Sequence, residues 1–118
     1  MTTERRWTRI TEAKNIPPRE GRAVRVGNIE LAIFNLNGRF LAIENECPHQ
    51  GGPLCDGIVS GTAVVCPLHA WSFDLETGVA VRAPRPACVA RFPTRVEDGI
   101  VVVDVAGGSR IETEEAAA

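Results

Sequence analysis

The 118 residues suffice for one domain with a hydrophobic core but leave no room for a second catalytic domain. With 44% hydrophobic and 24% charged residues, the composition is that of a globular protein rather than a disordered or membrane-embedded one. The net charge of −2 and the lack of a long apolar run in the sequence exclude a nucleic-acid footprint and a membrane span, so neither nucleic acid nor membrane is expected as a partner.

The first ten residues, MTTERRWTRI, do not contain the apolar region of a signal peptide, so we expect a cytoplasmic protein. The four cysteines of the chain would then lie in a reducing compartment, where disulfides are rare. In that setting, a pattern of cysteines more often indicates metal binding or catalysis.

Strand patterns dominate the first half of the chain. A short helical turn is expected over residues 10–14, with Thr11 as its cap. Apolar or alternating segments of strand length follow at residues 22–26, 29–36 and 39–45. The dipeptides at 27–28 (Gly-Asn) and 37–38 (Asn-Gly) predict hairpins, because these residues tolerate the positive φ that tight hairpin turns require.

The second half of the chain predicts shorter strands. They are expected at residues 62–66, 71–75, 79–81, 88–97 and 100–105. The dipeptide at 98–99 (Asp-Gly) predicts a hairpin between the last two. Residues 107–118, GGSRIETEEAAA, are expected to form a flexible acidic tail, so the single domain would span residues 1–106. The predicted fold class is all-β.

Residues 46–74 hold both histidines and three of the four cysteines of the chain. This region is richer in Gly, Pro, Cys and His than its flanks, and its predicted strands are shorter. We therefore expect a small loop-rich subdomain, at about residues 45–86, inserted between the strands of a larger β framework.

The Cys and His residues of this region form two matched pairs. The first is Cys47-x-His49 and the second is Cys66-x-x-His69, with sixteen residues (50–65) between the pairs. Two thiolates and two imidazoles are good ligands for a borderline or soft metal. A proline after each cysteine restricts the local backbone, and nearby glycines allow it to fold closely around a bulky group.

Three interpretations of these pairs compete. They could be ordinary buried residues, although two matched pairs rarely arise by chance. They could form a structural zinc site, but such sites usually pair Cys with Cys and His with His. They could bind a Rieske-type [2Fe–2S] cluster, in which two cysteines hold one iron and two histidines hold the other. Mixed Cys/His pairs on two loops are what this asymmetric cluster requires.

The motif C-x-H…C-x-x-H, with GGPL after the first pair and CPLHAWSFDLETG around the second, resembles the Rieske iron–sulfur family over about residues 5–105. The resemblance implies an antiparallel β sandwich or barrel base with a small inserted cluster-binding subdomain. It also implies that Cys47 and Cys66 bind the buried ferric iron and that His49 and His69 bind the outer iron. In this family a proline loop covers the cluster, and residues 82–87 (RAPRPA) stand at that place unless they form a plain connecting loop.

High-potential members of the family carry a disulfide between the two ligand loops and hydroxyl groups that donate to the cluster sulfurs. The matching positions here are Gly52 and Leu68 for the disulfide, and Trp71 and Phe73 for the hydroxyls. Hydrogen bonds to sulfur stabilise the reduced cluster, so their loss lowers the potential. We expect a potential toward the low end of the Rieske range of roughly −150 to +300 mV.

Two cysteines remain outside the motif. Cys55 lies within the first ligand loop and Cys88 follows the proline loop. Both are expected to be partly buried thiols, because cysteine often packs as a small apolar residue and the compartment does not favour a disulfide. The sequence assigns them no role.

The chain is expected to transfer electrons rather than to catalyse a reaction alone. Its two histidines are both used by the predicted cluster, so none remains for the mononuclear iron site of an oxygenase. It also contains no Gly-rich dinucleotide fingerprint after a strand, so it has no site for a nicotinamide. No catalytic residue is therefore predicted, and catalysis would belong to a partner.

The segments GRAVRVGNIELAIFNLNGRFLAI and CVARFPTRVEDGIVVV, which flank the motif, resemble the small subunit of cytoplasmic NAD(P)H-dependent nitrite reductase. The implied partner is a large sirohaem and flavin subunit that reduces nitrite to ammonia. The alternative is a Rieske ferredoxin, which shuttles electrons from a flavin reductase to an aromatic-ring-hydroxylating dioxygenase. For both, we expect docking at an apolar tip that includes Gly51, Gly52, Pro53, Leu68 and Pro84.

Overall fold

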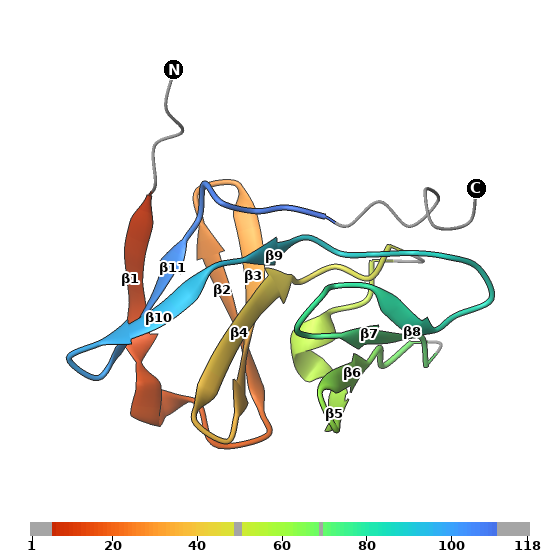
Figure 1. Cartoon of the computed structure of the whole chain (residues 1–118), viewed down its shortest axis with the longest axis horizontal. Coiled ribbons are helices and arrows are strands. Elements are labelled where there is room, and N and C mark those ends of the chain that lie inside the picture. The colour runs from red at the N-terminus through yellow and green to blue at the C-terminus, as the bar shows by residue number, and fades with distance from the viewer. Residues whose placement is uncertain (1–5, 49–50, 69, 111–118) are drawn as a thin grey trace.

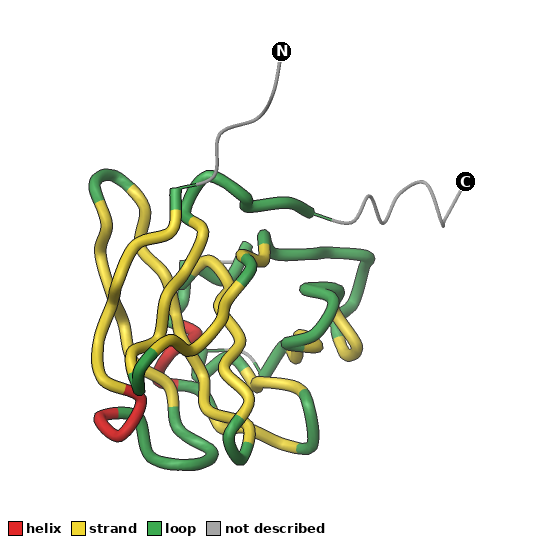
Figure 2. The backbone as a smooth tube through the Cα atoms, turned by 60° about the vertical axis from the view of Figure 1, so that its left-hand side comes forward, coloured by secondary structure: helices red, strands yellow, loops and turns green. Residues whose placement is uncertain are grey.

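The computed structural model describes residues 6–48, 51–68 and 70–110. The regular secondary structure of these residues is almost entirely antiparallel β-strand, with two single-turn 3-10 helices, η1 (Ala13–Asn15) and η2 (Leu54–Asp56) (Figures 1 and 2). This confirms the predicted all-β class. The described residues include no helix that is long and apolar enough to cross a bilayer.

The strands form three sheets. The first has the order β1 (Trp7–Glu12), β11 (Ile100–Asp104), β10 (Thr94–Glu97). The second has the order β2 (Gly21–Val26), β3 (Ile29–Leu36), β4 (Arg39–Glu44), β9 (Arg91–Phe92). The third has the order β5 (Ile58–Ser60), β6 (Ala63–Val65), β7 (Ser72–Asp74), β8 (Ala80–Arg82). Figure 1 shows the third sheet beside β4, on the side of the molecule away from β1 and β11.

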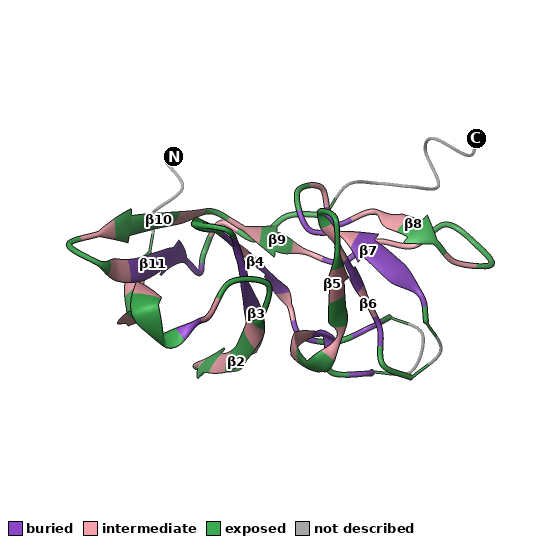
Figure 3. Cartoon of the chain, turned by 90° about the horizontal axis from the view of Figure 1, so that it is seen from below, coloured by how far each residue is buried: buried purple, intermediate pink, exposed green. Residues whose placement is uncertain are grey.

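Strand β3 is buried on both faces and separates two hydrophobic cores (Figure 3). Leu31 and Ile33 face β11, where they pack with Val101 and Val103 in what we call the base core. The alternate residues face the third sheet and belong to what we call the loop core. These residues are Ala32, Phe34 and Leu36. Because successive side chains of a strand point to opposite faces, one strand of eight residues serves both cores.

The predicted hairpins between β3 and β4 and between β10 and β11 are confirmed. Asn37 and Gly38 have φ of 56° and 103°, and Asp98 and Gly99 have φ of 54° and 77°. Both turns therefore place positive φ at their two central residues, as a type I′ turn requires. The first turn is reinforced by Asn35, whose Oδ1 accepts a hydrogen bond from the Gly38 N–H at 2.7 Å.

The helical turn predicted at residues 10–14 occurs, but about two residues later and without the predicted cap. These residues belong mostly to β1, which pairs with β11 as far as Glu12, and η1 begins only at Ala13. Thr11 does not cap η1: its Oγ1 accepts a hydrogen bond from Asn15 Nδ2. Pairing with β11 supplies hydrogen bonds that an isolated turn could not, so tertiary structure overrides the local preference.

The predicted strand at 88–97 is divided in two. Pro93 separates β9, which pairs with β4, from β10, which pairs with β11 in another sheet. Proline has no N–H to donate to a ladder, so the chain changes sheets at this residue. Strand β5, which was not predicted, pairs with β6.

The predicted tail does not begin at residue 107. Ser109 and Arg91 exchange backbone hydrogen bonds of 2.9 and 3.0 Å, and the Arg110 guanidinium binds the Glu44 carboxylate. The chain is therefore held against β9 as far as residue 110, as Figure 1 shows above β9. The remaining part of the predicted tail, 111–118, lies outside the described residues.

Candidate functional site

The first predicted ligand loop leaves the end of β4 and turns back at Cys47. The Cys47 N–H donates to the Gly52 carbonyl at 2.9 Å, and the Gly51 N–H donates to the Cys47 carbonyl at 2.7 Å. Gly51 has a φ of 72°, a conformation that costs a residue with a side chain about 1–2 kcal/mol. We call residues 47–52 the first Cys loop.

The second predicted ligand loop joins β6 to β7 and repeats the same backbone pattern. The Cys66 N–H donates to the Trp71 carbonyl at 2.6 Å, and the Ala70 N–H donates to the Cys66 carbonyl at 3.1 Å. Ala70 has a φ of 64°, which places it in the position of Gly51. We call residues 66–71 the second Cys loop. Two stretches with different Cys–His spacing thus fold around their cysteines in the same way.

The two Cys loops touch each other at Gly52. A Cβ atom on Gly52 would lie 2.8 Å from Cys66 Sγ and 3.1 Å from Leu68 Cδ1, closer than van der Waals contact permits. A side chain at this position would have to displace Cys66 or Leu68, so glycine allows the loops to approach this closely. Gly52 and Leu68 are the positions at which high-potential members of the resembled family would carry a disulfide, and here they pack directly.

Both cysteines of the motif are buried in the loop core. Cys47 is 1% exposed and Cys66 is 3% exposed. Their neighbours in this core include Leu54, Trp71 and Phe73. Buried thiol sulfurs on two abutting loops within an apolar environment fit the cysteine-bound half of a [2Fe–2S] cluster, in donor chemistry and in the exclusion of water. His49 and His69, predicted to complete the ligand set, lie outside the described residues.

Asn45 anchors the first Cys loop, although the sequence did not single it out. Its Oδ1 accepts a hydrogen bond from the Cys55 N–H at 2.7 Å, and its Nδ2 donates to Glu30 Oε2 at 3.1 Å. Asn45, two residues before the loop, therefore binds both Cys55, three residues after the loop, and Glu30 of β3. No sequence signal indicates this role, because both partners are ten or more positions away.

The proline loop lies beside the second Cys loop. It leaves β8 and is closed at its base by the Ala80 N–H, which donates to the Ala87 carbonyl at 2.9 Å. Ala83 and Ala87 pack against the loop core, whereas Pro84 and Pro86 are exposed. Between the two prolines, the Arg85 guanidinium carbon lies 5.2 Å from the centre of the Trp71 ring.

The two cysteines outside the motif do not form a disulfide, as expected. Both are half-buried. Burial raises the pKa of the Cys55 thiol above its ordinary value, an effect that the hydrogen bond with Asn45 only partly opposes. The backbone of Cys88 bridges to Val79, which closes the base of the proline loop. Both residues therefore contribute to the packing and hydrogen bonding of the loops in which they lie.

Part of the predicted apolar tip is exposed. Leu68 is 51% exposed, and a shallow groove beside it is lined by residues that include Ile58, Cys66 and Pro67. Ile58 is 73% exposed. Gly52, by contrast, is buried between the two Cys loops and offers no surface to a partner. The prediction that Gly52 belongs to the docking face is therefore wrong.

The comparisons with known proteins agree with this geometry. Residues 6–93 match the model of the Rieske [2Fe-2S] domain. The chain is 38% identical over 88 residues to the 3-phenylpropionate/cinnamic acid dioxygenase ferredoxin subunit of Shigella flexneri, covering 73% of this chain and 83% of the relative.

Two solved structures have similar folds. One is in a complex of reduced oxygenase and oxidised ferredoxin of carbazole 1,9a-dioxygenase, with a TM-score of 0.80, 30% identity, and coverage of 90% of this chain and 97% of the other. The second is a candidate NADH-dependent nitrite reductase small subunit from Mycobacterium tuberculosis, with a TM-score of 0.77, 26% identity, and coverage of 85% and 95%.

The family match covers most of the chain, and the antiparallel sheets are those that the resemblance predicted. The cofactor is a Rieske [2Fe–2S] cluster, and the class of function is that of a Rieske ferredoxin-type electron carrier. This chain belongs to the Rieske [2Fe–2S] family.

Proposed function

We propose that the chain is the ferredoxin component of a multicomponent dioxygenase system. In this role it takes one electron at a time from a flavin reductase and delivers it to a separate oxygenase. The observation that carries the proposal is its 38% identity, over most of both chains, to a dioxygenase ferredoxin subunit.

Four residues are proposed to hold the cluster: Cys47, His49, Cys66 and His69. The cluster supplies a one-electron couple between its two-ferric and its mixed ferric–ferrous states. The proposed cluster-binding subdomain, at about residues 45–86, also contains the whole third sheet. Within it, the Cys47 and Cys66 thiols, which are buried in the apolar loop core, would hold one iron where packing excludes water.

The side chains around the second Cys loop favour a low potential. Trp71 and Phe73 are buried in the loop core, and neither carries the hydroxyl that high-potential members place there. Fewer hydrogen bonds to the cluster sulfurs leave the added electron less stabilised. A low-potential carrier can pass electrons onward to an oxygenase, which is consistent with the proposed role.

The second candidate is the small subunit of NAD(P)H-dependent nitrite reductase, with a large sirohaem and flavin subunit as its partner. The structural likeness to the candidate subunit from Mycobacterium tuberculosis supports it. The segments that flank the Cys/His motif in the sequence favoured this function over a ferredoxin. The greater identity to a dioxygenase ferredoxin now favours the shuttle instead.

Affinity capture tests which partner the chain serves. The tagged protein is recovered from its own cells grown on nitrate and, separately, on an aromatic carbon source, and captured proteins are identified by mass spectrometry. Recovery of a flavin reductase or an oxygenase supports the ferredoxin role. Stable recovery of a large sirohaem-containing chain on nitrate would overturn it in favour of nitrite reductase.

The ligand assignment is tested by substitution. His49→Ala, His69→Ala, Cys47→Ala and Cys66→Ala should each abolish the Rieske electron paramagnetic resonance signal. Cys55→Ala and Cys88→Ala are the matched controls, since they remove a cysteine from outside the proposed ligand set, and both should retain it. A normal signal in any of the first four variants would refute the assignment of that residue.

A further inference from the structure

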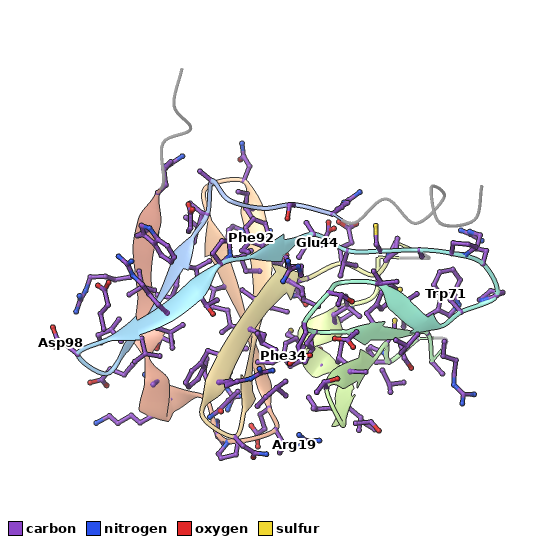
Figure 4. All side chains as sticks on the ribbon, in the orientation of Figure 1. Arg19, Phe34, Glu44, Trp71, Phe92 and Asp98 are labelled. Atoms are coloured by element: carbon purple, nitrogen blue, oxygen red, sulfur yellow. The ribbon has the colours of Figure 1, made fainter. Side chains whose placement is uncertain are left out.

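Arg85 is an exposed cation held in one place. It lies between Pro84 and Pro86, which fix the backbone on either side, and its guanidinium is stacked over Trp71. Trp71 is itself only 5% exposed, so the platform beneath the cation is part of the loop core. Figure 4 shows Trp71 within the curve of the loop that follows β8. An arginine restrained in this way loses little side-chain entropy on binding.

Neither Arg85 nor its neighbour Arg82 forms an ion pair with a described carboxylate. Among the other described cations, Arg6, Arg9, Arg19 and Arg91 also form no such pair, whereas six do have carboxylate partners. They are Lys14, Arg22, Arg25, Arg39, Arg95 and Arg110, paired respectively with Glu12, Glu20, Glu30, Glu76, Glu97 and Glu44. The proline loop thus presents two positive charges that no described acidic side chain neutralises.

Apolar surface accompanies these charges. Pro84 and Pro86, on either side of Arg85, are both exposed. The nearest strand, β7, carries Asp74, whose Oδ1 accepts a hydrogen bond from the Glu76 N–H, and Glu76 is paired with Arg39. The flank formed by Arg82, Pro84, Arg85 and Pro86 is therefore cationic and partly apolar, and we call it the cationic edge.

We infer that the cationic edge is a docking surface for a redox partner that carries a cluster of carboxylates beside its own redox centre. The inference rests on the proposed electron-carrier function. Arginines in rigid, partly apolar surroundings are frequent sites of strong binding energy in protein interfaces. Complementary charge also steers the encounter and raises its rate.

The cationic edge lies close to the second Cys loop. Arg85 is stacked on Trp71, and the carbonyl of Trp71 accepts the hydrogen bond from the Cys66 N–H. A partner seated on the edge therefore lies next to the second Cys loop. The cluster held by these loops would supply the electron: with the reduced protein as donor, one ferrous iron would be oxidised to ferric and the partner would gain that electron.

Small redox reagents of opposite charge test the edge without a known partner. The reduced protein is mixed in a stopped-flow instrument with hexacyanoferrate(III), an anion, or with tris(phenanthroline)cobalt(III), a cation. The variants are Arg82→Gln and Arg85→Gln. Arg95→Gln is the control: it removes the same charge and a similar stacked contact, since Arg95 lies 4.0 Å over the Trp7 ring, but on the sheet remote from the Cys loops.

At low ionic strength, each edge variant should lower the ratio of the anionic to the cationic rate constant by about threefold or more relative to Arg95→Gln. The difference should vanish in high salt, where charges are screened. Equal ratios in Arg85→Gln, Arg82→Gln and Arg95→Gln would overturn the inference, because only the total charge would then matter.

A binding measurement supplies a second readout that involves no electron transfer. Hexacyanocobaltate(III), a redox-inert anion of the same charge as hexacyanoferrate(III), is titrated into isotopically labelled protein. The amide signals of β8 should shift in the parent and in Arg95→Gln, and the shift should be weaker in Arg85→Gln. Shifts that are unchanged in Arg85→Gln contradict a cationic edge.

These outcomes separate the two proposals. A protein with no Rieske signal, or one that neither reagent can oxidise, would refute the electron-carrier function itself. A protein with a normal signal and normal electron transfer, but with no difference between edge and control variants, would leave that function intact and refute the docking edge alone.

Discussion

Gly51 and Ala70 hold equivalent positions in the two Cys loops, and both have positive φ. Each donates its N–H to the carbonyl of the cysteine four residues earlier. The backbone conformation is therefore common to the two loops, but only one of them has the residue that adopts it without strain.

We predict that Gly51→Ala destabilises the protein by about 1 kcal/mol, because a β-carbon disfavours this φ. Glu46 Oε2 would lie 3.4 Å from the new atom, an ordinary contact, so strain in the backbone is the main cost. The matched variant Ala70→Gly should stabilise the protein slightly or leave it unchanged. Midpoints of urea unfolding, followed by circular dichroism, measure both effects, and an unchanged midpoint for Gly51→Ala contradicts the prediction.

Asn45 connects three segments through one side chain. We predict that Asn45→Ala costs about 1–3 kcal/mol, since it leaves the partly buried Cys55 N–H without its acceptor. The rate of cluster loss in mild denaturant, read from visible absorbance, should rise accordingly. Asn15→Ala is the control, because the hydrogen bond from Asn15 to Thr11 is exposed to solvent and its loss should have little effect. Equal rates in the two variants would show that Asn45 does not anchor the loop.

At the scale of elements, the segment after β11 binds the end of β4, the strand that leads into the first Cys loop. Arg110 forms a two-pronged contact with Glu44, at 3.1 Å from Nε to Oε1 and 2.9 Å from Nη2 to Oε2. The same carboxylate accepts the Ala90 N–H at 2.6 Å. Glu44 thus joins three segments at the end of β4, three residues before Cys47.

We predict that Arg110→Ala lowers the free energy of unfolding by about 1 kcal/mol, because a bidentate contact to a mostly buried carboxylate exceeds an ordinary surface pair. Lys14→Ala is the matched control, since the Lys14–Glu12 pair is exposed and should contribute little. High salt should reduce the difference. If both variants unfold at the same denaturant concentration, the contact between Arg110 and Glu44 does not stabilise β4.

At the scale of the whole molecule, the base core and the loop core differ in the lengths of the strands that form them and in their dependence on the cluster. The buried strand residues of the base core come from β3, β4 and β11, which have five to eight residues each. The loop core also takes residues from the third sheet, whose strands have only three residues each, and from the two Cys loops. Short strands supply few hydrogen bonds, so the third sheet depends more on the cluster that its loops bind.

We predict that removal of the iron–sulfur cluster loosens the third sheet and leaves the base core folded. Hydrogen exchange of the apoprotein should lose protection at β6 and β7 while β3 and β11 remain protected. The holoprotein in the same buffer is the reference. Uniform loss of protection across all three sheets would contradict this, because it would show that the two cores unfold as one unit.

Features encoded by neighbouring residues could be predicted from the sequence. The turns at Asn37-Gly38 and Asp98-Gly99 follow from two adjacent residues that tolerate positive φ. The spacing of Cys47 and Cys66 with their histidines similarly indicated the cluster family, because the chemistry of the donors is local to each loop.

Features that depend on distant partners were decided only by the tertiary structure. β1 is a strand because β11 lies beside it, and the chain changes sheets at Pro93 because β4 and β11 offer separate edges. The anchoring of Asn45 to Cys55 and the stacking of Arg85 on Trp71 likewise join residues ten or more positions apart. The sequence by itself determined the two hairpin turns and the Cys and His residues predicted to bind the cluster. The turns depend on short-range sterics, and the ligands depend on the chemistry of their own side chains. Pairing, anchoring and docking surfaces required the folded chain, since their energy comes from contacts between remote segments.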